Sequence, residues 1–152
     1  MPRVEKVDLK PVGYVRRVSR QEDVKDRMLT CQIVIRRELA KALDGLEDFS
    51  HLFVIFYMHE VKGEDARKLK VHPRGKLALP LVGVFATRSA FRPNPIGLTV
   101  VELLERSGNV LLVKGLDAFD GTPVLDLKPV DDRDRVTRPR EPEWLKKLHA
   151  VK

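Results

Sequence analysis

The chain has 152 residues, with 29 Lys and Arg against 22 Asp and Glu, and a formal net charge of +7. That length fits one domain with its own core, and we expect a single domain over residues 1–152. The positive charge favours a polyanionic partner, although a charge that only maintains solubility has the same composition. Cys31 is the single cysteine, which excludes a disulfide framework and a cysteine-based metal site.

The N-terminal sequence lacks the apolar segment of a signal peptide, and no apolar run is long enough for a membrane span. We therefore expect a cytoplasmic protein without a membrane partner.

Strand patterns begin near the N-terminus. Residues 11–18 predict a short strand, and residues 30–36 predict a second whose Cys31, Ile33 and Ile35 share one buried face. Residues 38–43 predict one helical turn before the Asp44-Gly45 breaker. Residues 51–59 are almost continuously apolar, which predicts a central strand covered on both faces.

The second half of the chain begins with a polar, basic segment, 61–79, which we expect to be a long surface loop. Four more strands are predicted at residues 81–87, 98–105, 110–116 and 124–127. Residues 107–109 predict a hairpin turn between the middle pair. From Pro142 the spacing of Trp144, Leu145, Leu148 and Val151 predicts a helix with one apolar face.

These elements alternate as strand and turn, without the helices that connect parallel strands. Short strands with one peripheral helix favour an antiparallel barrel or sandwich over a doubly wound sheet. We expect the β structure to occupy residues 8–130 and a C-terminal extension with the helix to occupy residues 131–152.

Residues 85–98 contain two arginines and an asparagine held between two prolines. Pro93 and Pro95 have fixed φ angles and also restrict the backbone of the residues before them, Arg92 and Asn94. Little conformational entropy would therefore be lost when these residues bind a ligand. Arginine offers a planar fork to a carboxylate or phosphate. The alternative is a rigid connection whose arginines pair with nearby acids.

Residues 116–129 contain a second unusual loop, in which Asp120-Gly121 is a common turn and Thr122-Pro123 returns to an extended strand. Asp117, Asp120 and Asp126 are explained equally well as turn and capping residues. A loop carboxylate can also accept hydrogen bonds from ribose hydroxyls, and glycine permits close approach of a ligand.

His59-Glu60 ends the apolar strand, where general acid–base chemistry or ligand binding is possible; a polar exit to solvent is the alternative. His51 and His59 are eight residues apart in one strand, about 26 Å, which is too far to share a metal ion. We predict no metal site.

The segments Ser50-His51-Leu52 with His59-Glu60, residues 83–89, residues 92–97, residues 120–123 and residues 126–129 together resemble one family. It is the tRNA threonylcarbamoyladenosine N6-methyltransferase family, also called TsaA-like or TrmO-like. The resemblance extends from about residue 11 to residue 129. It implies an all-β fold, a single-sheeted antiparallel β-barrel, that forms a homodimer, binds S-adenosyl-L-methionine and methylates tRNA beside the anticodon.

The resemblance also implies which residues bind the cofactor. Positions that match the family's cofactor-binding positions are His59, Glu60, Arg88, Leu98, Asp120, Gly121, Thr122 and Pro123. Arg92 and Asn94 lie in the same motif and are added by inference. Arg88 or Arg92 would bind the methionyl carboxylate, Asp120 or Glu60 the ribose, and the backbone near Leu98 the adenine.

A proton must leave the attacking nitrogen, and His59, Glu60 and Asp117 are the candidate acceptors. The basic residues expected to contact tRNA phosphates are Lys62, Arg67, Lys68, Lys70, Arg74 and Lys76, with a further basic run at 133–140. Two other functions remain open from the residues alone. One is a non-catalytic module that binds RNA or a nucleotide, and the other is a metal-assisted hydrolase using His59, Glu60 and the aspartates.

Overall fold

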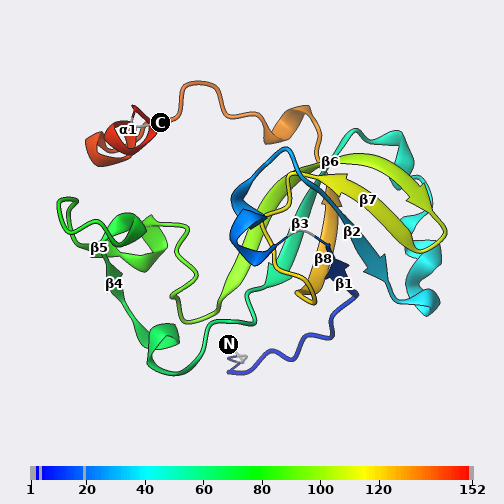
Figure 1. Ribbon diagram of the computed structural model, residues 1–152, viewed down its shortest axis with the longest axis horizontal. Helices are drawn as coiled ribbons and strands as arrows, with labels where there is room; N and C mark the ends of the chain where they lie inside the picture. The colour runs from blue at the N-terminus through cyan, green and yellow to red at the C-terminus, as the bar shows by residue number, and fades with distance from the viewer. Residues whose placement is uncertain (1–2, 4, 19, 151–152) are drawn as a thin grey trace. The chain divides into compact units, whose positions relative to one another are not determined.

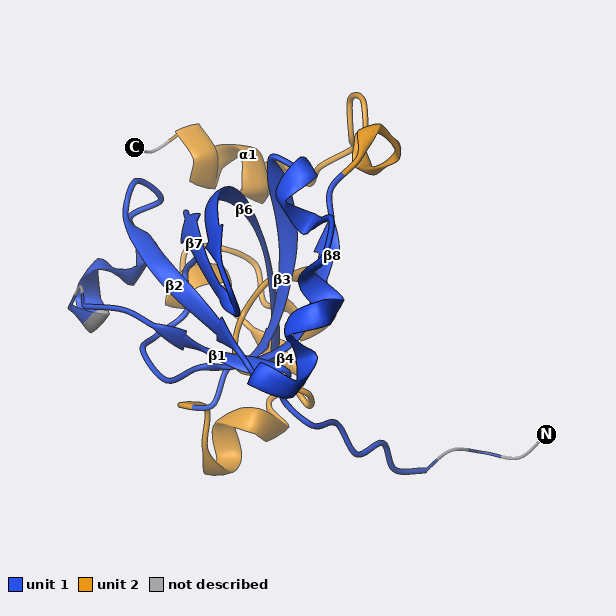
Figure 2. Cartoon of the chain, turned by 90° about the vertical axis from the view of Figure 1, so that its right-hand side faces the viewer, with its two compact units in different colours: residues 1–59, 96–130 blue, residues 60–95, 131–152 orange. Residues whose placement is uncertain are grey.

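The computed structural model describes residues 3, 5–18 and 20–150. The chain forms two compact units, coloured separately in Figure 2. The barrel unit contains Met1–His59 and Ile96–Val130, and the second unit contains Glu60–Pro95 and Asp131–Lys152. Each unit is therefore built from two separate segments of the sequence.

The barrel unit is a closed antiparallel barrel of six strands, which confirms the predicted fold class (Figure 1). Its strands are β1 (Gly13–Arg16), β2 (Thr30–Ile35), β3 (His51–Tyr57), β6 (Ile96–Ser107), β7 (Val110–Lys114) and β8 (Pro123–Pro129). Their order around the barrel is β1-β2-β7-β6-β3-β8, and pairing of β1 with β8 closes it. Three 3₁₀ helices lie in the connections, η1 (Gln21–Lys25), η2 (Arg37–Leu43) and η3 (Leu46–Asp48).

The barrel interior is filled by alternate side chains of the strands. Cys31, Ile33 and Ile35 of β2 are buried, as the alternation in the sequence predicted. The turn between β6 and β7 is also as predicted, because Ser107 pairs with Val110 across Gly108 and Asn109.

The prediction that β3 is covered on both faces is wrong. Its inward side chains are buried, whereas the outward ones are half-buried or exposed. A closed barrel buries only the inner face of each strand, so the apolar residues on the other face stay partly accessible. These residues pair with apolar outward residues of β6 and form what we call the outer apolar face. Its pairs are Phe53 with Val100, Ile55 with Leu98, and Tyr57 with Ile96.

The second unit contains short elements where a long loop was expected. Segment 61–79 includes η4 (Gly63–Arg67), β4 (Lys70–Val71) and η5 (Pro73–Gly75), and β4 pairs with β5 (Val82–Gly83). The strand predicted over residues 81–87 is limited to β5, because the chain turns into η6 (Val84–Ala86). The Thr87 amide and hydroxyl both donate to the Val84 carbonyl and close that turn.

The C-terminal part of the second unit contains η7 (Asp132–Asp134) and α1 (Glu143–Ala150). The predicted C-terminal helix is confirmed, and Leu148 on its apolar face is buried. Val151, which was expected to extend that face, lies outside the described residues.

Candidate functional site

The turn at Asp120-Gly121-Thr122 is tied to β1 and to the residue after it by three hydrogen bonds. The Gly121 amide donates to the Val15 carbonyl (2.8 Å), and the Val15 amide donates to the Thr122 carbonyl (2.9 Å). The Arg17 amide donates to Oδ1 of Asp120 (2.7 Å). Gly121 has a φ of +74°, a left-handed conformation that favours glycine. The turn is thus fixed by the barrel itself.

His59 lies beside this turn. Its Nδ1 is 3.3 Å from Oγ1 of Thr122, a side chain that is only 2% exposed. The contact follows from the antiparallel pairing of β3 with β8, in which Phe56 lies opposite Val124. The end of β3 therefore meets the start of β8. The structure brings together these two predicted site residues, which are 63 positions apart.

Asp117 is engaged by neighbours within the barrel unit. Its Oδ1 accepts from the Thr99 hydroxyl (2.5 Å), and its Oδ2 lies 3.4 Å from Nη2 of Arg27. Both carboxylate oxygens thus have protein partners. This arrangement identifies Asp117 as a structural link between β6 and the segment that follows β7.

Arg17 is a buried arginine that was not predicted from the sequence. Its Nη2 donates to the Leu116 carbonyl (2.5 Å), and its side chain lies beside the Cys31 thiol. Burial raises the pKa of Cys31, against the opposing effect of the Arg17 charge. Among the residues that the structure describes, Nε and Nη1 of Arg17 are buried without a hydrogen-bond partner.

A sequence signal for Arg17 existed. Gly13, Val15 and Arg17 occupy alternate positions, and all three are buried. The alternation therefore placed a charged residue in an inward position, which is costly without partners. Arg17 now contacts both ends of the Leu116–Asp120 connection, through its side chain and its amide.

Leu98 and Gly97 have different roles in β6. Leu98 points outward on the outer apolar face and is 59% exposed. Gly97 lies opposite Phe56, and a Cβ on it would be 2.3 Å from the Phe56 ring. Gly97 is therefore required for packing of the barrel.

Arg88, Arg92 and Asn94 all belong to the second unit, and they are held differently. Arg92 is half-buried, and its Nη2 donates to the carbonyls of Val84 and Thr87, both at 3.1 Å. It braces the turn at η6. Arg88 and Asn94 are exposed. Of the two arginines considered for a ligand carboxylate, Arg88 is thus the one directed to the surface.

The predicted RNA-binding residues all lie in the second unit and are all exposed. They are Lys62, Arg67, Lys68, Lys70, Arg74 and Lys76. Lys68 makes two contacts there, with Asp65 at 2.8 Å and with the centre of the Phe91 ring at 4.8 Å. Glu60 is likewise exposed.

Comparisons with known proteins identify the family. The sequence profile of the tRNA-methyltransferase O N-terminal domain matches residues 15–134. This chain belongs to that family. A relative from Methanothermobacter thermautotrophicus, named "Probable S-adenosyl-L-methionine-binding protein", is 44% identical over 128 residues, or 81% of this chain and 89% of the relative.

A TrmO-family relative from Escherichia coli is named tRNA (adenine(37)-N6)-methyltransferase. It is 46% identical over 94 residues, which are 59% of this chain and 40% of that protein. A solved structure of TrmO superposes with a TM-score of 0.72 and 32% identity, over 90% of this chain and 63% of the solved one. The chain thus spans less than two thirds of these two longer proteins.

The TrmO-family match includes every residue predicted to bind the cofactor. Those in the barrel unit are His59, Leu98 and Asp120 to Pro123, and those in the second unit are Glu60, Arg88, Arg92 and Asn94. The α1 helix lies beyond the matched residues.

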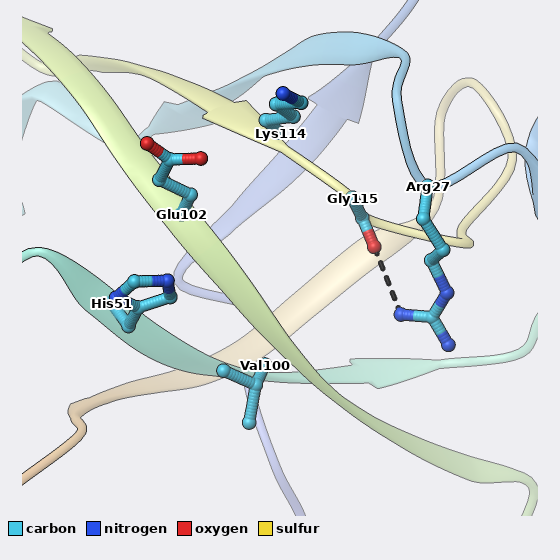
Figure 3. Close-up of a pocket in the computed structure, with 6 residues that line it drawn as sticks. All are labelled: Arg27, His51, Val100, Glu102, Lys114 and Gly115. Carbon is cyan, nitrogen blue, oxygen red and sulfur yellow. Dashed lines mark hydrogen bonds between the residues drawn. The ribbon is translucent and has the colours of Figure 1, made fainter.

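A shallow hollow of about 330 Å³ lies on the outside of the barrel (Figure 3). His51, Glu102 and Lys114 form a row across β3, β6 and β7. The other lining residues are Arg27, Val100 and Gly115, and Arg27 donates to the Gly115 carbonyl (3.0 Å). None of the six was predicted as a site residue, although His51 belongs to one of the segments that carry the family resemblance.

Across residues 3, 5–18 and 20–150, no group of three or more His, Cys, Asp or Glu side chains is arranged to hold a metal ion. In the same part of the chain, no helix is long and apolar enough to cross a membrane.

Proposed function

We propose that the chain transfers a methyl group from S-adenosyl-L-methionine to N6 of threonylcarbamoyladenosine in tRNA, next to the anticodon. The observation that carries this proposal is the family match over residues 15–134, which includes all the predicted cofactor-binding residues. A tRNA-directed activity also fits the net charge of +7. We assign the protein to the cytoplasm because its proposed substrate is tRNA.

Within each unit, the chemistry of the predicted residues suits this cofactor. The turn at Asp120 is fixed before any ligand arrives, its carboxylate side chain is exposed, and Gly121 allows close approach. We assign ribose binding to Asp120 or Glu60, and adenine binding to the backbone near Leu98. We assign the methionyl carboxylate to Arg88, since Arg92 already braces η6. Thr122 would orient His59.

The cofactor supplies an activated methyl group, so no covalent nucleophile is needed. The protein has to align the acceptor nitrogen, exclude water and accept one proton. We assign proton acceptance to His59 or Glu60. Asp117 is the third candidate, and its two oxygens contact Thr99 and Arg27.

We also propose a homodimer in which a second copy covers the outer apolar face. Three apolar cross-strand pairs lie on that face, and Leu98, Val100 and Tyr57 are exposed. A contiguous apolar surface of this kind is typical of a protein interface. Val100→Asp should reduce the mass measured by light scattering from two chains to one. An unchanged dimer would show that the contact lies elsewhere.

Calorimetry tests the cofactor assignment. S-adenosyl-L-methionine, or its demethylated product, should bind stoichiometrically and raise the melting temperature, because a ligand that binds only the folded state stabilises it. The absence of binding at saturating ligand would contradict the proposal. Transfer of a labelled methyl group to tRNA separates the enzyme from a non-catalytic RNA-binding module.

A further inference from the structure

Phe85 is the most unusual exposed residue of the second unit. Its side chain is 83% exposed, whereas Val84, immediately before it, is 2% exposed. Leaving a large aromatic ring in water forgoes the free energy of burying it. The residue lies in η6, so the turn buries one side chain and presents the next one to solvent.

The turn that carries Phe85 is braced from several directions. The Val84 amide donates to the Leu69 carbonyl (3.0 Å), and the Thr87 amide and hydroxyl donate to the Val84 carbonyl. Arg92 adds two further bonds, to the Val84 and Thr87 carbonyls. The backbone beneath the ring is therefore ordered in advance, which reduces the entropy lost when a ligand binds.

Cationic side chains flank this turn. Lys70 pairs with Gly83 in the β4–β5 ladder, two residues before Phe85. Leu69, which is bonded to Val84, lies between Lys68 and Lys70 in the sequence. Lys68 also lies over the ring of Phe91, a second exposed aromatic residue. Aromatic rings among cations are the combination that binds single-stranded nucleic acid, with bases stacked on the rings and phosphates beside the cations.

We propose that Phe85 stacks on an unpaired RNA base, with Lys68 and Lys70 contacting the neighbouring phosphates. RNA as the partner rests on the proposed function. A second copy of the chain is a less suitable partner for this turn than RNA, because a symmetric contact would bring the same lysines of the two copies together. Duplex RNA is also a poorer occupant, because its base faces are already stacked.

The first experiment measures binding of a fluorescent, unstructured single-stranded RNA by anisotropy, without cofactor. Phe85→Ala should weaken binding by about fivefold to a hundredfold, and Phe85→Trp should retain it. Leu77→Ala is the matched control, since Leu77 is 82% exposed in the same unit but is not in η6. Its affinity should match that of the wild type.

Salt dependence separates stacking from charge. Lys70→Ala should reduce the slope of log affinity against log salt by about 0.7 for the lost contact, whereas Phe85→Ala should leave the slope unchanged. A second readout uses Phe85→Trp combined with Trp144→Phe, which leaves one tryptophan at the turn. Single-stranded RNA should quench its fluorescence, and an RNA duplex at the same concentration should not.

The proposal is overturned if Phe85→Ala binds RNA as the wild type does. It is also overturned if that variant only reduces self-association, which would make the turn a protein contact. These results are distinguishable from failure of the proposed function. Failure of methyl transfer by the wild type would remove the enzyme assignment, whereas RNA binding at Phe85 is measured without cofactor.

Discussion

The sequence singled out loops at residues 85–98 and 116–129, and the parts of them that lie outside the long barrel strands are held in opposite ways. Segment 116–123 is fixed by the barrel, through bonds from Val15, Arg17 and Thr99. Segment 83–94 is braced largely by its own residues, with Arg92 bonded to Val84 and Thr87. Changes in the first loop should therefore disturb the fold as well as the ligand. Substitutions of exposed side chains in the second loop should change ligand binding without changing the stability of the fold.

Arg88→Ala tests the second half of this contrast and has the largest expected effect. Loss of a hydrogen bond to a charged group is worth about 1.5–3 kcal/mol, so cofactor affinity should fall roughly tenfold to a hundredfold. The melting temperature without ligand should not change, because Arg88 is exposed. Calorimetry measures both quantities, with Lys76→Ala as the control. A variant that binds cofactor normally but fails with RNA would reassign Arg88 to the RNA.

Two glycine substitutions, one in each unit, should change the stability of the protein by different amounts. Gly97→Ala places a Cβ 2.3 Å from the Phe56 ring, and such overpacking costs about 1–3 kcal/mol. The melting temperature should fall by about 2–4 °C per kcal/mol. Gly83→Ala meets no atom closer than 4.0 Å and should be neutral or slightly stabilising. If both substitutions lowered the melting temperature by the same amount, the difference in packing between Gly97 and Gly83 would be contradicted.

Thr122→Val should lower both the stability of the fold and the affinity for the cofactor, each by a smaller amount. It keeps the shape of a buried side chain and removes the hydroxyl that lies 3.3 Å from His59. We expect about 1 kcal/mol less stability and about fivefold weaker cofactor binding. Thermal unfolding and calorimetry measure the two changes. Thr87→Val is the comparison, because it breaks two hydrogen bonds that both lie within the second unit, one to the Val84 carbonyl and one from the Ser89 amide. Normal cofactor binding by Thr122→Val would exclude an orienting role for the residue.

The smallest effect concerns Asp131 in the second unit. Hydrogen bonds from Arg133 lower the pKa of Asp131 from 3.8 to about 2. Because the folded-state pKa is lowered, its stabilising contribution is present above about pH 3.8 and is lost as the pH falls through about 2. Arg133→Gln should raise the pKa of Asp131 towards 3.8, as measured by carbon NMR of the carboxyl group. An unchanged titration would show that Arg133 is not the cause.

Local patterns predicted most of the barrel. The alternation at Cys31, Ile33 and Ile35 and the turn at Gly108-Asn109 depend on neighbouring residues, and both were correct. The strand expected over residues 81–87 was too long, because side-chain bonds of Thr87 and Arg92 convert an apolar run into a 3₁₀ turn. Local propensity contains no information on such bonds.

The site was less predictable because its contacts are non-local. Thr122 meets His59 only after β3 pairs with β8, and Arg17 reaches Leu116 across 99 positions. The family resemblance supplied His59 and Thr122 as site positions without supplying this geometry. Nothing in the spacing around Phe85 indicated which apolar residue of the segment would be left exposed.

The most direct test of the proposed activity is transfer of a labelled methyl group from S-adenosyl-L-methionine to tRNA, followed by digestion to nucleosides. We predict that the label is recovered in N6-methylated threonylcarbamoyladenosine, and that tRNA lacking the threonylcarbamoyl group remains unlabelled. Label in a different nucleoside would contradict the assigned acceptor. Binding of cofactor and tRNA without methyl transfer would contradict the proposed enzymatic activity and would support a non-catalytic binding module instead.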